Sequence, residues 1–306
     1  MRNTFADTFF EAAQTDPRLC AVVADISPAG SMLRFREKFP DRFINTGVAE
    51  QIMIGIVAGM ALRGLKPFAY TIASFALFRP YEFVRDDLCY QNLPVTVVGI
   101  GGGVTYSTLG ATHHALEDIG LATTLPNMQV IAPSDPAEVR EATRWCVAQT
   151  NGPVYLRLGK AGEPILTKDA IDPWQFGKLR YLRRGRDLCI LSYGPVMKIA
   201  IEIADRLAAQ GTSVSVVSAH TLKPLDQAGV REALASHRHV VVIEDTLPNG
   251  GLTGRVKDLA LATKATCRLD CFTLKDEFIH CYGSYEQTLA AHGLSANHIL
   301  AAIGAA

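Results

Sequence analysis

The most constraining feature of this sequence is the regular alternation of short apolar runs with segments of helical periodicity. Alternation of this kind predicts an α/β fold in which mainly parallel sheets are flanked by helices. At 306 residues, 48% of them hydrophobic, the chain is long enough to bury two such cores. The apolar runs, which we predict to be strands, occupy residues 19–24, 66–72, 93–100, 129–132, 153–158, 187–192, 213–218, 239–244 and 266–272.

Residues 159–186 interrupt this alternation. They carry Gly, Pro, Lys and Arg without clear periodicity, as interdomain linkers often do. We therefore predict a first domain over residues 1–162, a linker over 163–186 and a second domain over 187–306.

Composition and charge narrow the function. Thirty basic residues balance thirty acidic ones, which argues against nucleic acid or a membrane surface as the partner. The seven cysteines are scattered without a CxxC pattern, so neither a disulfide framework nor a metal site is predicted in this chain. No apolar run has the length of a bilayer-spanning helix, and the first residues lack the apolar core of a signal peptide. We expect a cytoplasmic protein.

Residues 43–62 are predicted to form a buried helix with a carboxylate in its first turn. Asn45 and Thr46 are good N-cap residues, and Gly64 is placed to end the helix. The carboxylate is Glu50. It either complements the positive end of the helix dipole or serves as a buried catalytic group, and the residues alone leave both interpretations open. The apolar positions at helical spacing are Ile52, Met53, Ile56, Val57 and Met60.

Several other segments follow predicted strands, where open α/β sheets place functional groups. Asp25 begins the segment 25–28, which is either a site loop or an ordinary turn. Phe75, Phe78 and Tyr81 recur every third residue, a stripe that fits a core as well as a ring-stacking surface. Residues 101–110 are rich in glycine but lack the Gly-Lys-Ser/Thr of a phosphate loop, so we interpret them as lining a site.

Two further features are chemically specific. His113 and His114 begin a predicted helix capped by Thr112, and no third ligand at metal spacing accompanies them. Arg157 lies inside an apolar strand, where an arginine needs an anionic partner or a sheet edge.

Ordered motifs along nearly the whole chain resemble the transketolase family, namely its pyrimidine-binding domain followed by its C-terminal domain. The matching stretches are 45–51 (NTGVAEQ), 74–81 (SFALFRPY), 110–118 (GATHHALED), 125–128 (LPNM), 132–135 (APSD), 153–159 (PVYLRLG), 221–226 (TLKPLD) and 250–252 (GGL).

One part of the family pattern is missing. Members also need a diphosphate-binding domain with a Gly-Asp-Gly motif and an Asn that hold Mg²⁺, and no such pattern occurs here. The resemblance therefore implies a split enzyme that uses thiamin diphosphate. An N-terminal transketolase subunit would bring the diphosphate and Mg²⁺ site, and a heterotetramer is expected because the family's active sites form at dimer interfaces. We assign the second domain to assembly.

The resemblance also implies roles for individual residues. Glu50 would be the catalytic glutamate that hydrogen-bonds the aminopyrimidine ring, and His113 would be a substrate-facing catalytic histidine. The other implied contacts are the rings of Phe75, Phe78 and Tyr81 around the pyrimidine, Asp25 and Ile26 beside the thiazolium, and Arg2 and Arg157 as a clamp on a sugar phosphate.

Three departures from the family affect the substrate pocket. Ala29 stands where a serine is typical, Gly101-Gly102 where a histidine and an acid are, and Leu109 where an aspartate is. Losing these polar groups predicts a roomier, more apolar pocket and poor discrimination for ordinary ketose phosphates. The leading hypothesis is therefore two-carbon ketol transfer from a modified or atypical ketose to an aldehyde. Thiamin-dependent decarboxylation of a 2-oxo acid with carboligation, and a non-catalytic docking subunit, are the alternatives.

Overall fold

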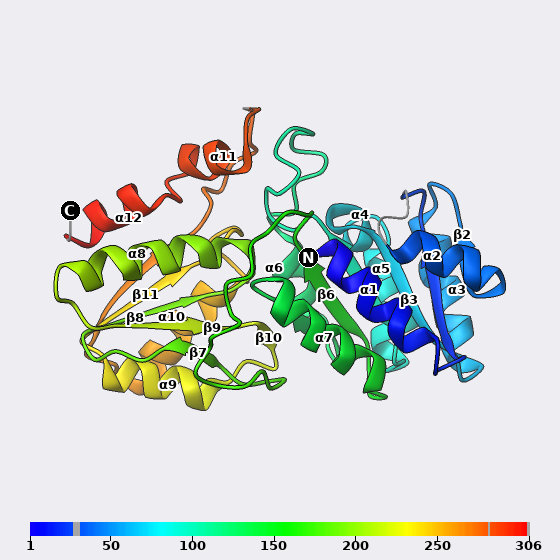
Figure 1. Ribbon diagram of the computed structural model, residues 1–306, viewed down its shortest axis with the longest axis horizontal. Helices are drawn as coiled ribbons and strands as arrows, with labels where there is room; N and C mark the ends of the chain where they lie inside the picture. The colour runs from blue at the N-terminus through cyan, green and yellow to red at the C-terminus, as the bar shows by residue number, and fades with distance from the viewer. Residues whose placement is uncertain (27–30, 281, 305–306) are drawn as a thin grey trace.

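The computed structural model describes residues 1–26, 31–280 and 282–304 and shows two α/β lobes side by side (Figure 1). The predicted fold class is confirmed, because both sheets are parallel except for one edge strand each. The first sheet has the order β10-β5-β6-β4-β3-β1-β2. Its strands are β1 (Leu19–Val23), β2 (Phe43–Asn45), β3 (Lys66–Ile72), β4 (Thr96–Ile100), β5 (Gln129–Ile131), β6 (Val154–Leu158) and β10 (Thr221–Lys223).

Helices cover both faces of this sheet. One face packs against α1, α2 and α7 through a cluster that includes Phe5, Phe9 and Phe35. The other face packs against α3, α4, η2 and α6. The helical segments of this lobe are α1 (Arg2–Ala13), α2 (Ser31–Lys38), η1 (Pro40–Arg42), α3 (Glu50–Leu62), α4 (Ala73–Leu77), α5 (Tyr81–Phe83), the π-helical η2 (Val84–Tyr90), α6 (Asp118–Thr124) and α7 (Pro136–Ala148).

The second lobe repeats the plan on a smaller scale, with strand order β12-β11-β8-β9-β7. Its strands are β7 (Arg180–Arg183), β8 (Leu188–Ser192), β9 (Val214–Ser218), β11 (His239–Ile243) and β12 (Arg268–Phe272). Its helical segments are η3 (Gly194–Val196), α8 (Met197–Ala209), α9 (Gln227–Ser236), α10 (Leu252–Thr263), α11 (Tyr285–Ala291) and α12 (Ala296–Ile303).

Two short strands tie the lobes and the connecting segment together, and neither was predicted. β10 leaves the second lobe to pair antiparallel with β5, so the first sheet ends in a strand from the other half of the chain. β7 lies inside the predicted linker and pairs antiparallel with β9 at the edge of the second sheet. Both are too short to carry a readable periodicity.

Two predicted helix starts are wrong. Asn45 ends β2 and Thr46 lies between strand and helix, so α3 begins only at Glu50 with Ala49 in the cap position. Residues 111–117 form turns, a bend and the bridge residue Ala115, and α6 begins at Asp118 rather than behind Thr112. The predicted apolar stripe of α3 is also shifted. Ile52 is 59% exposed, whereas Met53, Ile54, Val57 and Ala58 are buried.

Within the described residues, none of the helices combines the length and apolar character needed to cross a bilayer.

Candidate active site

The candidate residues converge because of strand order. β4, β3, β1 and β2 are neighbours and run parallel, so the segments that follow them meet at one edge of the first sheet. Asp25 follows β1, Glu50 follows β2, Phe75 follows β3, and the glycine-rich segment follows β4.

Glu50 is a buried carboxylate at the first position of α3. The residue is 2% exposed, although ionised side chains are seldom buried without a partner. The approach to the helix is held by Thr46, whose hydroxyl donates to the Val23 carbonyl oxygen at 3.2 Å. Burial and orientation of this carboxylate agree with the first-turn position predicted from the sequence.

Arg79 is the partner of Glu50. Its Nη1 lies 3.2 Å from Oε1 and 3.1 Å from Oε2 of the carboxylate. The arginine side chain is 46% exposed, and its guanidinium carbon lies 4.5 Å above the centre of the Phe75 ring. Sequence reasoning missed this residue, although it stands inside the stretch 74–81 between Phe78 and Pro80.

The three aromatic residues are half-buried and have different partners. The Phe75 ring meets the His113 ring edge-on, with centroids 5.2 Å apart. Phe78 lines a hollow together with Thr112 and His114. The Tyr81 hydroxyl donates to the Leu121 carbonyl oxygen at 3.1 Å, which ties its ring to α6.

His113 stands in the loop between β4 and α6, which rises where the two lobes meet (Figure 1). Its Nδ1 lies 2.9 Å from the Thr112 hydroxyl. Burial lowers the pKa of His113, so the neutral imidazole, which can accept a proton, is favoured. Burial also lowers the pKa of His114, which is 3% exposed.

The glycines at 101 and 102 do not enlarge the pocket, which corrects the sequence-based prediction. A Cβ on Gly101, whose φ is +82°, would lie 2.1 Å from the Tyr106 ring. A Cβ on Gly102 would lie 2.4 Å from Nε of Arg157. Tyr106 and Arg157 therefore fill the space that side chains would take. Leu109 is 48% exposed, and Ala29 lies outside the described residues.

Tyr106 is a second residue that sequence reasoning missed. It is buried, its ring centroid lies 6.2 Å from that of His113, and Lys160 Nζ lies 5.2 Å from the centre of its ring. Burial raises the pKa of Tyr106, and the nearby Arg2 guanidinium opposes that rise. Arg2 is thereby placed beside this residue, and its buried Nε has no hydrogen-bond partner among the described residues.

Arg157 has anionic partners, as its position inside an apolar strand requires, and these partners engage its guanidinium group. Nε donates to Asp118 Oδ2 at 2.8 Å, and Nη1 donates to Asp245 Oδ1 at 2.7 Å. The arginine is 2% exposed and both carboxylates are 0% exposed. This placement contradicts a clamp on substrate phosphate, because the guanidinium offers no free surface to a ligand.

Asp25 and Ile26 lie at the carboxyl end of β1. Asp25 is exposed with a φ of +44°, and its backbone N–H donates to Asn45 Oδ1 at 3.1 Å. Ile26 is half-buried against the core of the first lobe. Residues 27 and 28 of the predicted site loop fall outside the described residues.

Contacts thus join Glu50, Arg79, Phe75, His113 and Tyr106 in one row. A buried carboxylate beside aromatic rings suits a flat heteroaromatic ring that needs one charged contact and apolar faces. In the part of the chain that the structure describes, no group of three His, Cys, Asp or Glu side chains is arranged to hold a metal ion.

Comparison with known proteins agrees with this geometry. Residues 1–162 match the transketolase pyrimidine-binding domain, and residues 177–299 match the transketolase C-terminal domain. The structure resembles a split-gene transketolase solved as an inactive beta4 tetramer, with a TM-score of 0.88 and 32% identity over 99% of this chain and 96% of that one. It also shares its fold with Campylobacter jejuni transketolase, with a TM-score of 0.79 and 17% identity over all of this chain and 46% of that one.

Curated relatives are similar over most of their length. An apulose-4-phosphate transketolase subunit of Actinobacillus succinogenes is 30% identical over 98% of this chain and 96% of its own. The 6-deoxy-6-sulfo-D-fructose transketolase subunit SqwH of a Clostridium species is 37% identical over 82% of this chain and 78% of its own. The chain therefore belongs to the transketolase family and comprises that family's pyrimidine-binding and C-terminal domains.

Proposed function

We propose that this chain is the C-terminal subunit of a split transketolase that transfers a two-carbon ketol unit from a ketose to an aldehyde with thiamin diphosphate. The observation that carries the proposal is the Glu50 carboxylate at the carboxyl edge of the first sheet, which is 2% exposed and is linked through Arg79 to the Phe75 ring. The Phe75 ring in turn meets the His113 ring edge-on.

The residues present fit the pyrimidine end of the cofactor. Glu50 would hold a nitrogen of the aminopyrimidine ring, and Phe75, Phe78 and Tyr81 would pack around that ring. Arg79 contacts both oxygens of Glu50, so when the ring binds, the arginine would have to turn away or share the carboxylate with it. The arginine side chain is 46% exposed, which gives it room to move. When bound, thiamin diphosphate supplies the nucleophilic carbon that breaks and forms carbon–carbon bonds next to a carbonyl.

His113 is positioned to exchange a proton with the substrate. Its neutral imidazole is favoured by burial, and the Thr112 hydroxyl fixes the orientation of its ring. Arg2 beside Tyr106 remains the proposed contact for an anionic group of the substrate, and Asp25 and Ile26 remain proposed neighbours of the thiazolium. Arg157 is not part of this site.

A second subunit is needed to complete the site. The sequence has no Gly-Asp-Gly motif. Relatives that match over nearly their full length are named as a transketolase subunit in Actinobacillus succinogenes and as a putative transketolase C-terminal section in Methanocaldococcus jannaschii. An N-terminal subunit would hold the diphosphate and Mg²⁺. The heterotetramer and the cytoplasmic location stay predictions.

An atypical ketose is the proposed donor. The two relatives described above are named for apulose-4-phosphate and for 6-deoxy-6-sulfo-D-fructose, and neither name is that of a common pentose phosphate. Here the Tyr106 ring takes the place of a side chain at position 101, and Leu109 of the same loop is 48% exposed. Apolar and aromatic surface replaces the polar groups that read an ordinary ketose phosphate.

Decarboxylation of a 2-oxo acid is the alternative. It is favoured by relatives named 1-deoxy-D-xylulose-5-phosphate synthase, such as that of Azoarcus, which is 32% identical over 98% of this chain and 47% of its own length.

The test is to assemble the chain with its N-terminal subunit, thiamin diphosphate and Mg²⁺, and to offer a panel of ketoses and 2-oxo acids. Ketol transfer without release of CO₂ is the expected result, and Glu50→Gln should abolish exchange of the thiazolium C2 proton. CO₂ release with carboligation would establish the alternative. Unchanged exchange in the Glu50→Gln enzyme would refute the role of Glu50, and an assembly inactive on every donor would indicate a docking subunit.

A further inference from the structure

We propose that the second domain positions the loop that carries His113, and that Asp245 is the positioning residue through which it does so. This goes beyond the assembly role assigned to that domain. The inference rests on the proposed function only for the importance of His113, because the contacts and the test below do not require catalysis.

The loop between β4 and α6 is anchored in the core of the second lobe. Val104 is 0% exposed and Leu116 is 4% exposed, and both belong to the apolar cluster formed by β8, β11 and their helices. Among the partners in that cluster are Ile190, Val241 and Leu274. By sequence the loop belongs to the first domain, but by packing its two ends belong to the second.

Backbone hydrogen bonds close the base of the loop and attach it to the second lobe. Gly103 and Ala115 exchange N–H···O bonds of 3.1 and 2.9 Å. The Leu247 N–H, which follows β11, donates to the Leu116 carbonyl oxygen at 3.1 Å. Ala115 and Leu116, which these bonds hold, follow His113 by two and three residues.

Asp245 reaches the same base through Arg157. Its Oδ1 accepts from Arg157 Nη1 at 2.7 Å, while Nη2 of that arginine lies 3.4 Å from the Ala115 carbonyl oxygen. A Cβ on Gly103 would come within 2.1 Å of Asp245 Oδ2, so the loop backbone lies directly against this carboxylate. Asp245 therefore orients the guanidinium and supports the backbone on either side of the loop base.

The pKa of His113 should change if the loop base loses this support. This pKa is lowered by burial. The titratable groups near His113 include Tyr106 and His114 of its own loop and Arg79, whose guanidinium lies over the Phe75 ring that contacts His113. Loosening the loop base would expose the imidazole and raise its pKa toward that of a free histidine, about 6.5. Loss of the Asp245 charge by itself would act in the opposite direction and lower the pKa.

The experiment is an NMR pH titration of the eight histidines in the full chain, with His113 assigned by comparison with His113→Gln. In Asp245→Asn we expect the His113 pKa to rise toward the value of a free histidine. Glu138→Gln is the matched control, because it also alters a buried carboxylate that pairs with an arginine, here Arg180, and whose hydrogen bonds among the described residues do not include the loop. It should leave His113 unchanged.

Val104→Ala provides a second route if Asp245→Asn does not fold. It loosens the apolar anchor without altering any charge, and a smaller rise of the His113 pKa is expected. An unchanged or lowered His113 pKa in the folded Asp245→Asn protein would overturn the proposal. An equal rise in Glu138→Gln would do the same, because the effect would then follow from general loosening rather than from Asp245.

Discussion

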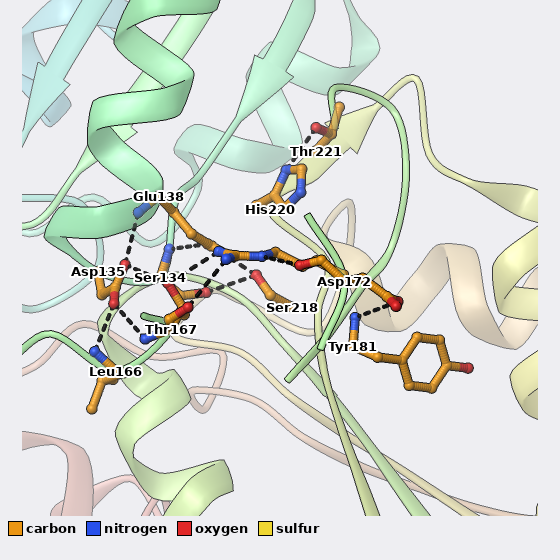
Figure 2. A network of polar contacts seen from close by, with 11 residues as sticks. Ser134, Asp135, Glu138, Leu166, Thr167, Asp172, Tyr181, Ser218, His220 and Thr221 are labelled. Atoms are coloured by element: carbon orange, nitrogen blue, oxygen red, sulfur yellow. Dashed lines mark hydrogen bonds and ion pairs between the residues drawn. The ribbon is translucent and has the colours of Figure 1, made fainter. Parts of the chain in front are cut away.

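Two buried polar networks join the lobes of this protein, and they differ in what they hold. The first, which we name the loop network, consists of Arg157, Asp118 and Asp245. The second, the linker network, is centred on Glu138 and Arg180 and is shown in Figure 2. Both pair carboxylates that are 0% exposed with arginine, and both cross between the lobes.

The linker network holds the connecting segment. Glu138 accepts from the Ser134 N–H at 2.8 Å and from the Ser218 hydroxyl at 3.0 Å, which brings α7 and β9 together. Asp135 accepts from the backbone of Leu166 and Thr167, both at 2.6 Å (Figure 2). None of these bonds reaches the loop that carries His113. The chemistry of a buried ion pair therefore does not reveal its role, whereas the backbone that it contacts does.

The largest effect should come from Arg157→Met. It leaves Asp118 and Asp245 buried without their cation, and breaking a buried pair in this way costs about 3 to 5 kcal/mol. The free energy of unfolding from urea titration measures the change. A loss below about 1 kcal/mol would mean that the carboxylates find other partners or water.

Glu138→Gln should lower the free energy of unfolding by less, about 1 to 3 kcal/mol. The amide has the shape of the carboxylate, but its NH2 group leaves one of the three hydrogen-bond donors to Glu138 without an acceptor. The same urea titration applies. Because the linker network does not reach the loop that carries His113, the substrate kinetics of the assembled enzyme should stay unchanged in this variant. A fall in kcat would contradict this difference between the two networks.

His220 gives the linker network a pH dependence. Burial, with a smaller contribution from Arg180, lowers the pKa of His220 to about 3. Because the folded pKa lies below the unfolded value of about 6.5, this histidine's contribution is fully present above pH 6.5 and is lost as the pH falls toward 3. Between pH 6.5 and 5 the loss should be about 1 to 2 kcal/mol.

Unfolding free energies at pH 7.5 and 5 in wild type and His220→Gln isolate this contribution. Other histidines with lowered pKa, including His113 and His114, act in both proteins and cancel in the difference. Equal pH dependence in the two proteins would show that His220 can be protonated in the folded state.

The smallest effect is expected at an exposed pair. Arg183 and Asp205 form an ion pair in the second lobe, with side chains 45% and 59% exposed. Asp205→Asn should change the free energy of unfolding by less than about 0.5 kcal/mol. A larger loss would show that location in the second lobe, rather than burial, sets the energetic scale.

The sequence predicted what regular patterns encode. Apolar runs located the long strands, and ordered motifs located Glu50 and the aromatic residues. The short strands β7 and β10 were not predicted, because they are defined by pairing partners far away in the chain. The start of α3 at Glu50 was not predicted either, since Asn45 pairs with β1 instead of capping the helix.

Site contacts between side chains were predicted least well. Arg79 carries no signal of its own, because its position next to Glu50 depends on the packing of α5 and η2, which follow it in the chain, against α3. The need of Arg157 for an anion was predictable, but its partners Asp118 and Asp245 come from two domains and were not. Tyr106 fills the space at Gly101 only because the loop folds back, which no local pattern records.

The most direct test of the account is calorimetric titration of thiamin diphosphate, with Mg²⁺ present, into this chain, into its N-terminal subunit and into their mixture. If this chain supplies only the pyrimidine end of the site, the mixture should bind the cofactor tightly, Glu50→Gln should abolish that binding, and this chain alone should not bind tightly. Tight, Mg²⁺-dependent binding and turnover by this chain alone would contradict that division of the site.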